Sequence, residues 1–279
     1  MTLPDERPLI MGVLNVTADS FSDGGRFLAA EDAVAQGRRM IAAGADIVDV
    51  GGESSRPGAE PVQVAEELAR VVPVIEALAP EVRVSIDTVK PEVARAAVAA
   101  GATLVNDVSA SLVEVTAQLD AGYVVMHRQG TPKTMQVAPR YDDVVSEVSA
   151  FLADRAAQAE ALGIDEVWID PGIGFGKTPA HNLSLLRHLD RLVATGRPVL
   201  VGTSRKSFLG QLVARSDARA AARCSDSIEP ASGPPRPAPV GERLEASVAT
   251  ATWAMARGAR MVRVHDVGPT LQAAKVVAA

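Results

Sequence analysis

Six polar side chains end short β-rich runs of this 279-residue chain, at comparable places in a repeating pattern. They are Asn15, Asp87, Asn106, His127, Asp170 and His265. Carboxylate, amide and imidazole groups can bind a polar ligand or transfer protons, although a single Asp or Asn in such a place is more often a helix N-cap. Capping alone would not require side chains this varied, so together they predict a shared polar site.

A glycine-rich segment, residues 170–177, follows one of these runs and begins with Asp170. Its glycines allow the backbone to turn sharply and to approach a flat ligand closely. An aspartate there could accept two hydrogen bonds from an N–C–N edge, such as that of a 2-aminopyrimidinone. A tight turn with a capping aspartate is the other interpretation, so the segment needs support from its neighbours.

Two further segments could bind an anion. Residues 202–210 offer backbone N–H groups, hydroxyls and the cations Arg205 and Lys206 beside a predicted helix start, although an ordinary basic helix start would look similar. Arg263 and His265 are two residues apart on a predicted strand and therefore face the same side. A lone histidine is more often structural, but an arginine beside it can bind a pyrophosphate group through two hydrogen bonds.

The elements that must position these groups follow one repeated pattern. A helical stretch ends in glycine, a short apolar run follows, and a polar group closes the run. The eight runs are residues 9–14, 46–50, 82–86, 103–105, 123–126, 167–169, 199–201 and 261–264, of which 9–14 and 82–86 lack the leading glycine. Apolar strands that alternate with helices indicate a parallel sheet covered on both faces, and eight of them favour a closed barrel. A doubly wound fold is disfavoured, because no Gly-x-Gly-x-x-Gly follows the first strand.

We therefore predict an α/β fold in which residues 1–279 form a single (β/α)₈ TIM barrel. The polar groups would meet at its C-terminal mouth, where active sites of such barrels lie. Residues 214–239 interrupt the pattern, because they are rich in Arg, Ala, Ser and Pro and lack core periodicity. We expect a mobile surface insertion there. The stretch between Val108 and Tyr123 is short, which leaves the fourth βα unit undefined.

Composition narrows the function classes. The net charge of −6 argues against nucleic-acid or membrane binding, so an anionic substrate would need a local cluster of cations. No apolar run reaches ~18 residues and the first residues are not a leader, so we expect a cytoplasmic protein. The one cysteine, Cys224, excludes an intramolecular disulfide and is interpreted as a bystander.

Taken together, the motifs resemble those of the dihydropteroate synthases over about residues 8–277. The matching segments are residues 11–25, 51–58, 85–88, 106–108, 126–127, 130–136, 170–177, 204–206 and 263–266. Each is weak alone, and the set in this order is highly specific. The resemblance implies a transferase of folate biosynthesis that joins 6-hydroxymethyl-7,8-dihydropterin pyrophosphate to p-aminobenzoate and releases pyrophosphate.

The resemblance also implies a role for each matching residue. Asp87, Asn106, Asp170 and Lys206 would line a pterin pocket, Arg263 and His265 would bind the pyrophosphate, and Asn15 would help to hold Mg²⁺ on it. The p-aminobenzoate side would comprise Ser54, Ser55, Arg56, Pro57, Phe175 and Ser207, with Asp23 ordering the first loop. Asp23, Arg56, Lys206, Arg263 and His265 are the residues expected to carry catalysis. Homodimers and sulfonamide competition with p-aminobenzoate are further implications.

Two residues depart from the family pattern. Ala18 stands where many relatives carry proline, and Ser55 replaces a common threonine while keeping the hydroxyl. Three other interpretations remain open at this point: a pterin-dependent methyltransferase domain, a non-catalytic pterin-binding paralogue and a purely structural barrel. We expect Arg263→Ala to abolish turnover while leaving the fold intact.

Overall fold

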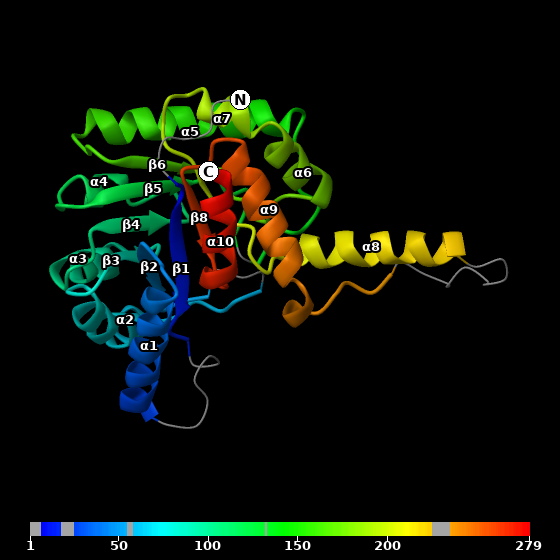
Figure 1. Cartoon of the computed structure of the whole chain (residues 1–279). Helices are drawn as coiled ribbons and strands as arrows, with labels where there is room; N and C mark the ends of the chain where they lie inside the picture. Colours follow the sequence, from blue (N-terminus) through cyan, green and yellow to red (C-terminus); the bar gives the residue numbers. More distant parts are fainter. Residues whose placement is uncertain (1–6, 18–24, 55–57, 132, 225–234) are drawn as a thin grey trace.

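A computed structural model describes residues 7–17, 25–54, 58–131, 133–224 and 235–279 (Figure 1). Its strands are β1 (Leu9–Asn15), β2 (Ile47–Gly51), β3 (Arg83–Asp87), β4 (Leu104–Asp107), β5 (Gly122–Met126), β6 (Val167–Asp170), β7 (Leu200–Val201) and β8 (Met261–Val264). They form one eight-stranded parallel sheet in the order β6-β5-β4-β3-β2-β1-β8-β7. A bridge between Ile169 and Val199 joins the two outer strands. The predicted barrel is therefore confirmed.

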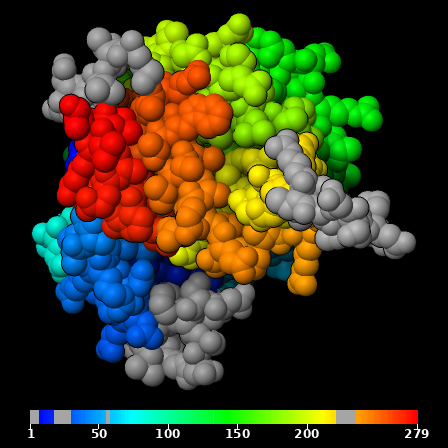
Figure 2. Space-filling view, turned by 45° about the vertical axis from the view of Figure 1, so that its right-hand side comes forward, coloured from blue at the N-terminus to red at the C-terminus, as the bar shows by residue number. Residues whose placement is uncertain are grey.

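Helices follow the strands around the outside of the barrel. They are α1 (Gly25–Ala42), α2 (Val64–Leu78), α3 (Pro91–Ala99), α4 (Val113–Thr116), α5 (Val144–Ala161), α6 (Pro179–Arg187), α7 (Leu189–Val193), α8 (Ser207–Cys224), α9 (Leu244–Ala256) and α10 (Val267–Val277), with a 3₁₀ turn η2 (Val240–Glu242) before α9. The four-residue α4 fills the stretch that the sequence left undefined. Figure 2 shows α9 and α10 side by side on one face, with α1 next to them.

The interior of the barrel is closed by an apolar plug. It comprises Met11, Ile47, Leu104, Val124, Trp168, Leu200 and Met261. Side chains alternate along a strand, so residues two positions further on also face inward. Those positions bring in polar groups, among them Asp49, Asn106, Asp170 and Arg263. The polar layer consequently lies directly above the plug, at the ends of the strands.

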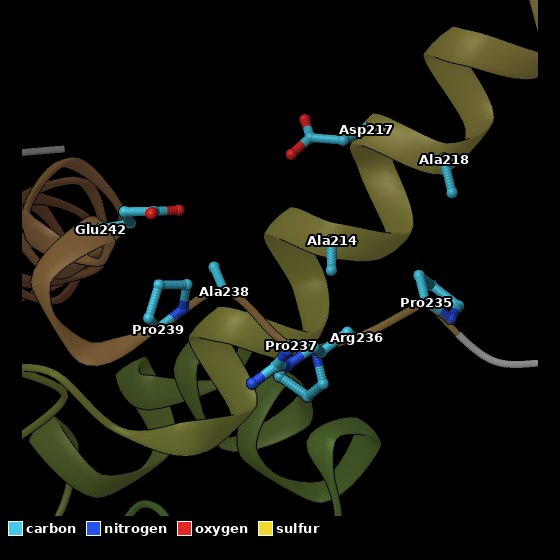
Figure 3. Close-up of a pocket in the computed structure, with 9 residues that line it drawn as sticks. All are labelled: Ala214, Asp217, Ala218, Pro235, Arg236, Pro237, Ala238, Pro239 and Glu242. Carbon is cyan, nitrogen blue, oxygen red and sulfur yellow. The ribbon is translucent and has the colours of Figure 1, made fainter.

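Helix α8 departs from the expected insertion. It continues past residue 214 to Cys224, because alanine and arginine are strong helix formers. Residues 215–220 are exposed, which agrees with the lack of core periodicity. The returning segment, residues 235–239, passes alongside α8 (Figure 3), and the Ala238 N–H donates to the Gly210 carbonyl at 3.1 Å. The first part of residues 214–239 is therefore helix, residues 225–234 lie outside the described part, and mobility stays a prediction.

Among the described helices, none combines the length and the apolar character needed to cross a membrane.

Candidate functional site

A pocket opens at the C-terminal mouth of the barrel, above the plug. Its lining comes from strand ends and the loops that follow them: Val13, Asp87, Asn106, Val108, Met126, Asp170, Phe175, Gly202, Ser204, Lys206, Arg263 and His265. A larger hollow lies between α8 and residues 235–239 (Figure 3), but no strand end contributes to it. The barrel-mouth pocket is therefore the candidate active site.

Arg263 organises the floor of this pocket. Its Nε donates to Asp49 Oδ2 at 2.6 Å, and its Nη2 donates to Asp87 Oδ2 at 2.7 Å. Asn106 Nδ2 donates to the same oxygen of Asp49 at 3.0 Å. Within the described part of the chain, Nη1 of Arg263 has no partner, so it remains able to donate to a ligand. The floor is thus a buried network that keeps Nη1 of Arg263 as a donor for a ligand.

The charges of this network depend on burial. Burial raises the pKa of Asp87 to about 7, and the Arg263 guanidinium opposes that rise. Burial also lowers the pKa of Arg263, but Asp49 and Asp87 outweigh it and leave the value raised. Arg263 therefore stays a cation, while Asp87 can change its protonation near neutral pH.

Asp49 is a residue that the sequence analysis missed. It lies in the middle of β2, whereas the sequence prediction considered only polar residues at the ends of strands. Its side chain is fully buried. Its Oδ1 is buried without a hydrogen-bond partner among the described groups. An acidic residue inside the apolar run Ile-Val-Asp-Val was the available signal, because a buried charge needs a partner.

Lys206 and the glycine-rich segment form one wall. The Lys206 ammonium donates to the Ile173 carbonyl and lies 4.7 Å from the centre of the Phe175 ring. Burial lowers the pKa of Lys206 to about 8, with Asp170 opposing. Burial raises the pKa of Asp170, and its Oδ1 accepts a hydrogen bond from the Gly172 N–H at 2.7 Å. A carboxylate, an ammonium and an aromatic ring thus line one side of the pocket.

Ser204 and His265 form the opposite rim. The Ser204 hydroxyl lies 3.0 Å from His265 Nδ1 and accepts from the His265 backbone N–H at 3.2 Å. Arg205 points elsewhere, because its guanidinium pairs with Asp266 at 2.6 Å. Ser207 is the exposed first residue of α8, beside the pocket and not in its lining.

Two predicted site residues differ in position from the others. Asn15 is the half-buried last residue of β1, at the mouth and outside the pocket lining. His127, which follows β5, turns away from the pocket and contacts the ammonium of Lys177 instead. A residue just after a strand can face into the barrel mouth or away from it. The sequence alone does not decide between the two, so the prediction that His127 lies in the shared polar site was wrong.

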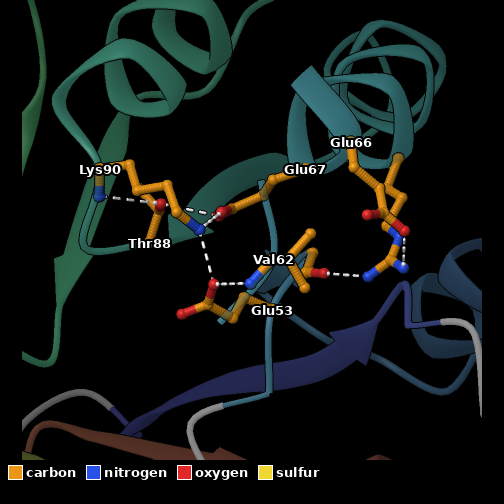
Figure 4. Close-up of polar contacts among 8 residues, drawn as sticks. Glu53, Val62, Glu66, Glu67, Thr88 and Lys90 are labelled. Carbon is orange, nitrogen blue, oxygen red and sulfur yellow. Dashed lines mark hydrogen bonds and ion pairs between the residues drawn. The ribbon is translucent and has the colours of Figure 1, made fainter. Parts of the chain in front are cut away.

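The loop after β2, residues 52–63, which we call the second loop, is anchored by a polar network (Figure 4). The Glu53 carboxylate accepts from the Val62 N–H and from Lys90 Nζ, both at 2.6 Å. Lys90 also pairs with Glu67, whose side chain is fully buried and accepts from the Thr88 hydroxyl at 2.7 Å. The network ties both ends of the loop to the barrel. Ser54 is half-buried in this loop, while Ser55, Arg56 and Pro57, like Ala18 and Asp23 in the first loop, lie outside the described residues.

Comparisons with known proteins agree with this geometry. The family described as "Pterin binding enzyme" matches residues 11–265, so the class is that of pterin-binding barrels. The dihydropteroate synthase of Escherichia coli K12 is 45% identical over 280 residues, covering 98% of this chain and 91% of the relative.

Two solved structures are similar over nearly the whole chain. Xanthomonas albilineans dihydropteroate synthase with 4-aminobenzoic acid has 46% identity and a TM-score of 0.83, covering 98% of this chain and 92% of that one. The Yersinia pestis synthase in complex with a sulfonamide drug has 41% identity and a TM-score of 0.84, with 99% and 95% covered. The chain belongs to the dihydropteroate synthase family, whose members are transferases of folate biosynthesis.

Proposed function

We propose that the chain condenses 6-hydroxymethyl-7,8-dihydropterin pyrophosphate with p-aminobenzoate to give 7,8-dihydropteroate and pyrophosphate. The observation that carries the proposal is the layer of Asp87, Asn106, Asp170, Lys206 and Arg263 above the apolar plug. Such a layer offers acceptors and donors to a flat heterocycle at the place where barrel enzymes bind substrates. The family and the ligands of its relatives support the same assignment.

The pterin ring would lie against Phe175 with its polar edge toward Asp170. Of the two Asp170 oxygens, Oδ1 accepts from Gly172, and Oδ2 makes no hydrogen bond to a described residue. Oδ2 can therefore accept from the N–C–N edge of a pterin. Lys206 and Asn106 would donate to ring acceptors, and Asp87, near its own pKa, can accept or donate.

The pyrophosphate would lie nearer the mouth. Nη1 of Arg263, His265 and the Ser204 hydroxyl are the groups of the pocket that can face it. Together they would stabilise the charge that grows on the leaving oxygen as the carbon–oxygen bond breaks. The aryl amine then forms the carbon–nitrogen bond and loses a proton to water. The reaction needs no side-chain nucleophile, so positioning and leaving-group stabilisation carry it.

Mg²⁺ would be held by Asn15 together with the pyrophosphate. Among the described residues, no group of three His, Cys, Asp or Glu side chains could hold a metal ion without a ligand. This fits magnesium, which usually takes one or two protein oxygens and completes its shell with phosphate and water. Bound there, it would offset the negative charge of the leaving group.

The p-aminobenzoate would enter beside Phe175 and Ser207. Ser54, with Ser55, Arg56 and Pro57, belongs to the loop that the Glu53–Lys90–Glu67 network anchors. This network fixes the described ends of that loop at Glu53 and Val62. We assign Arg56 to the substrate carboxylate, because a guanidinium can bind it through two hydrogen bonds.

The test is a turnover assay with purified protein. Both substrates and Mg²⁺ are supplied, pyrophosphate release is followed, and each component is omitted in turn. We expect dihydropteroate when all three are present, and competition between a sulfonamide and p-aminobenzoate. Tight pterin binding without product would identify a non-catalytic paralogue, and product formation from a methylated folate would identify a methyltransferase.

A further inference from the structure

Lys177 is a buried cation that the proposed reaction does not use. Its side chain is 2% exposed, and it forms no ion pair with a carboxylate in the described part of the chain. Its Nζ lies 2.9 Å from His127 Nδ1, and it donates to the carbonyls of His127 at 3.3 Å, Gly172 at 3.1 Å and Phe175 at 3.1 Å. The ammonium is therefore held by a ring of neutral acceptors.

These acceptors come from two different segments of the chain. Residue 127 ends the β5 region, whereas residues 172 and 175 belong to the loop after β6, which we call the glycine loop (residues 171–176). Burying an ammonium without such acceptors costs several kcal/mol. Burial, and then the charge of Lys177, lower the pKa of His127 to about 3, so the imidazole stays neutral and accepts at Nδ1. Lys177 thus joins the two segments through one atom.

The glycine loop needs this link because of its backbone. Gly172, Gly174 and Gly176 all have positive φ, at 64°, 87° and 65°. A Cβ on Gly172 would lie 1.9 Å from the His127 carbonyl oxygen, and one on Gly176 would lie 2.4 Å from that of Gln129. The loop therefore packs its backbone directly against residues 127–129, with carbonyls turned inward. Lys177 supplies the donors that those carbonyls require.

The glycine loop also carries the groups that hold Lys206. Its Ile173 carbonyl accepts from the Lys206 ammonium, and its Phe175 ring lies beneath that ammonium. Asp170 comes immediately before the loop and accepts from its Gly172 N–H. A shift of the loop is consequently passed to Lys206 and Asp170, two of the charged groups of the pterin pocket.

We propose that Lys177 is a positioning residue of the pterin pocket, which fixes the glycine loop around Lys206 and adds a positive charge near Asp170. The inference rests on the proposed pterin substrate. It assigns Lys177 no contact with that substrate. It predicts two separable effects, one from the hydrogen bonds and one from the charge.

The charge effect follows from the groups that face Asp170. Burial raises its pKa, whereas Lys206, Lys177 and Arg263 lower it, together with the hydrogen bond from Gly172. Burial lowers the pKa of Lys177 itself to about 7, with Asp170 opposing, so the side chain is an ammonium below that pH. Removing this charge raises the pKa of Asp170 further. The carboxylate is the form that accepts from the pterin edge, so binding should then begin to weaken at a higher pH as the solution is acidified.

The experiment measures the dissociation constant of 6-hydroxymethylpterin by calorimetry between pH 5 and 7. The proteins are the wild type, Lys177→Met, Lys177→Gln and Lys177→Arg. We expect Lys177→Met to bind about 10- to 100-fold more weakly at pH 7, the loss typical of a misplaced site. Lys177→Gln keeps a hydrogen-bond donor, so it should bind the pterin more tightly than Lys177→Met. It lacks the charge, so its acid limb, the pH range in which affinity falls on acidification, should move to higher pH. Lys177→Arg should keep the wild-type limb.

Leu192→Ala is the matched control for stability, because Leu192 is fully buried in α7 and does not touch the pocket. It should lower the melting temperature without changing pterin affinity. Wild-type affinity and an unmoved acid limb in Lys177→Gln would overturn the inference, whether or not Lys177→Met folds. Failure of the wild type to bind the pterin would instead overturn the proposed function.

Discussion

At the scale of single residues, the pocket is a set of charges that balance one another. Asp49, Asp87 and Asp170 face Arg263 and Lys206, so the described floor and wall together carry three carboxyl groups and two cations. An anionic pyrophosphate is not attracted by this floor as a whole. It needs Nη1 of Arg263, the rim groups and the bound Mg²⁺ proposed above.

Arg263 illustrates why one substitution can have two effects. Arg263→Ala should abolish turnover, and it should also lower the free energy of unfolding by about 3–5 kcal/mol, because Asp49 and Asp87 lose their buried partner. This revises the expectation of an intact fold that the sequence alone suggested. Urea denaturation measures the effect, with Arg263→Lys as the charge-preserving control. Equal stability of the alanine variant and the wild type would contradict the ion-pair account.

Lys206 should limit activity at alkaline pH. Its pKa is lowered to about 8, so the ammonium is present below that pH and is lost as the pH rises through it. The kcat/KM for the pterin substrate should therefore fall above pH 8. In Lys206→Arg the guanidinium stays charged, so the alkaline limb should disappear even if the absolute rate is lower. An unchanged limb in that variant would assign the titration to another group.

The sequence located most of the pocket-lining residues, because strand ends of a barrel meet at one mouth. Asp87, Asn106, Asp170, Lys206, Arg263 and His265 line the pocket, although their roles stay predictions. The search missed Asp49, since inward orientation in the middle of a strand depends on the register of the whole barrel. It placed His127 wrongly, since the residue after a strand is free to turn outward toward Lys177.

At the scale of elements, strands were easier to predict than helix ends. Each strand of the barrel lies within about a residue or two of its predicted run, because a buried parallel strand is a continuous apolar segment. The outer end of α8 was harder, since Ala and Arg continue a helix without a buried face to mark it. Residues 215–220 of α8 are exposed, so they show no periodic apolar positions from which a helix could be predicted.

The glycine loop should tolerate substitution less than an ordinary helix end. Alanine in a left-handed conformation costs about 1–2 kcal/mol, and this is the whole cost expected for Gly163→Ala, where a Cβ meets nothing within 4 Å. Gly172→Ala should cost more, because its Cβ would overlap the His127 carbonyl oxygen. Thermal melting and pterin affinity measure both effects. Similar losses in the two variants would show that the loop is not tightly packed.

At the scale of the whole molecule, the residues of the pocket floor lie on the barrel strands, and other segments project away from the barrel. The plug and polar layer belong to the strands, whereas the outer half of α8 and residues 235–239 extend beyond the barrel (Figure 1). The Ala238–Gly210 hydrogen bond brings the two ends of this extension close together. The extension can therefore be removed without stretching the chain.

Replacing residues 216–235 with a short Gly-Ser linker should leave kcat/KM within about twofold, because its described residues, 216–220 and 235, are exposed and such positions tolerate change. Steady-state kinetics measure this, with Leu209→Ala as a control that disturbs the buried start of α8. Sedimentation of the same proteins tests the homodimer that the family resemblance implies. A large loss of activity with an unchanged oligomeric state would show that the extension acts on the pocket.

The central claim is that the polar layer above the plug binds a pterin. Calorimetry with 6-hydroxymethylpterin tests it most directly, on the wild type, on Asp170→Asn, and on Asp46→Asn as a control outside the pocket, where the carboxylate pairs with Arg7. We predict binding by the wild type and by the control, and a loss of about 10- to 100-fold in Asp170→Asn, since a charge-assisted hydrogen bond contributes about 1.5–3 kcal/mol. Equal affinity in all three proteins, or no binding by the wild type, would contradict the account.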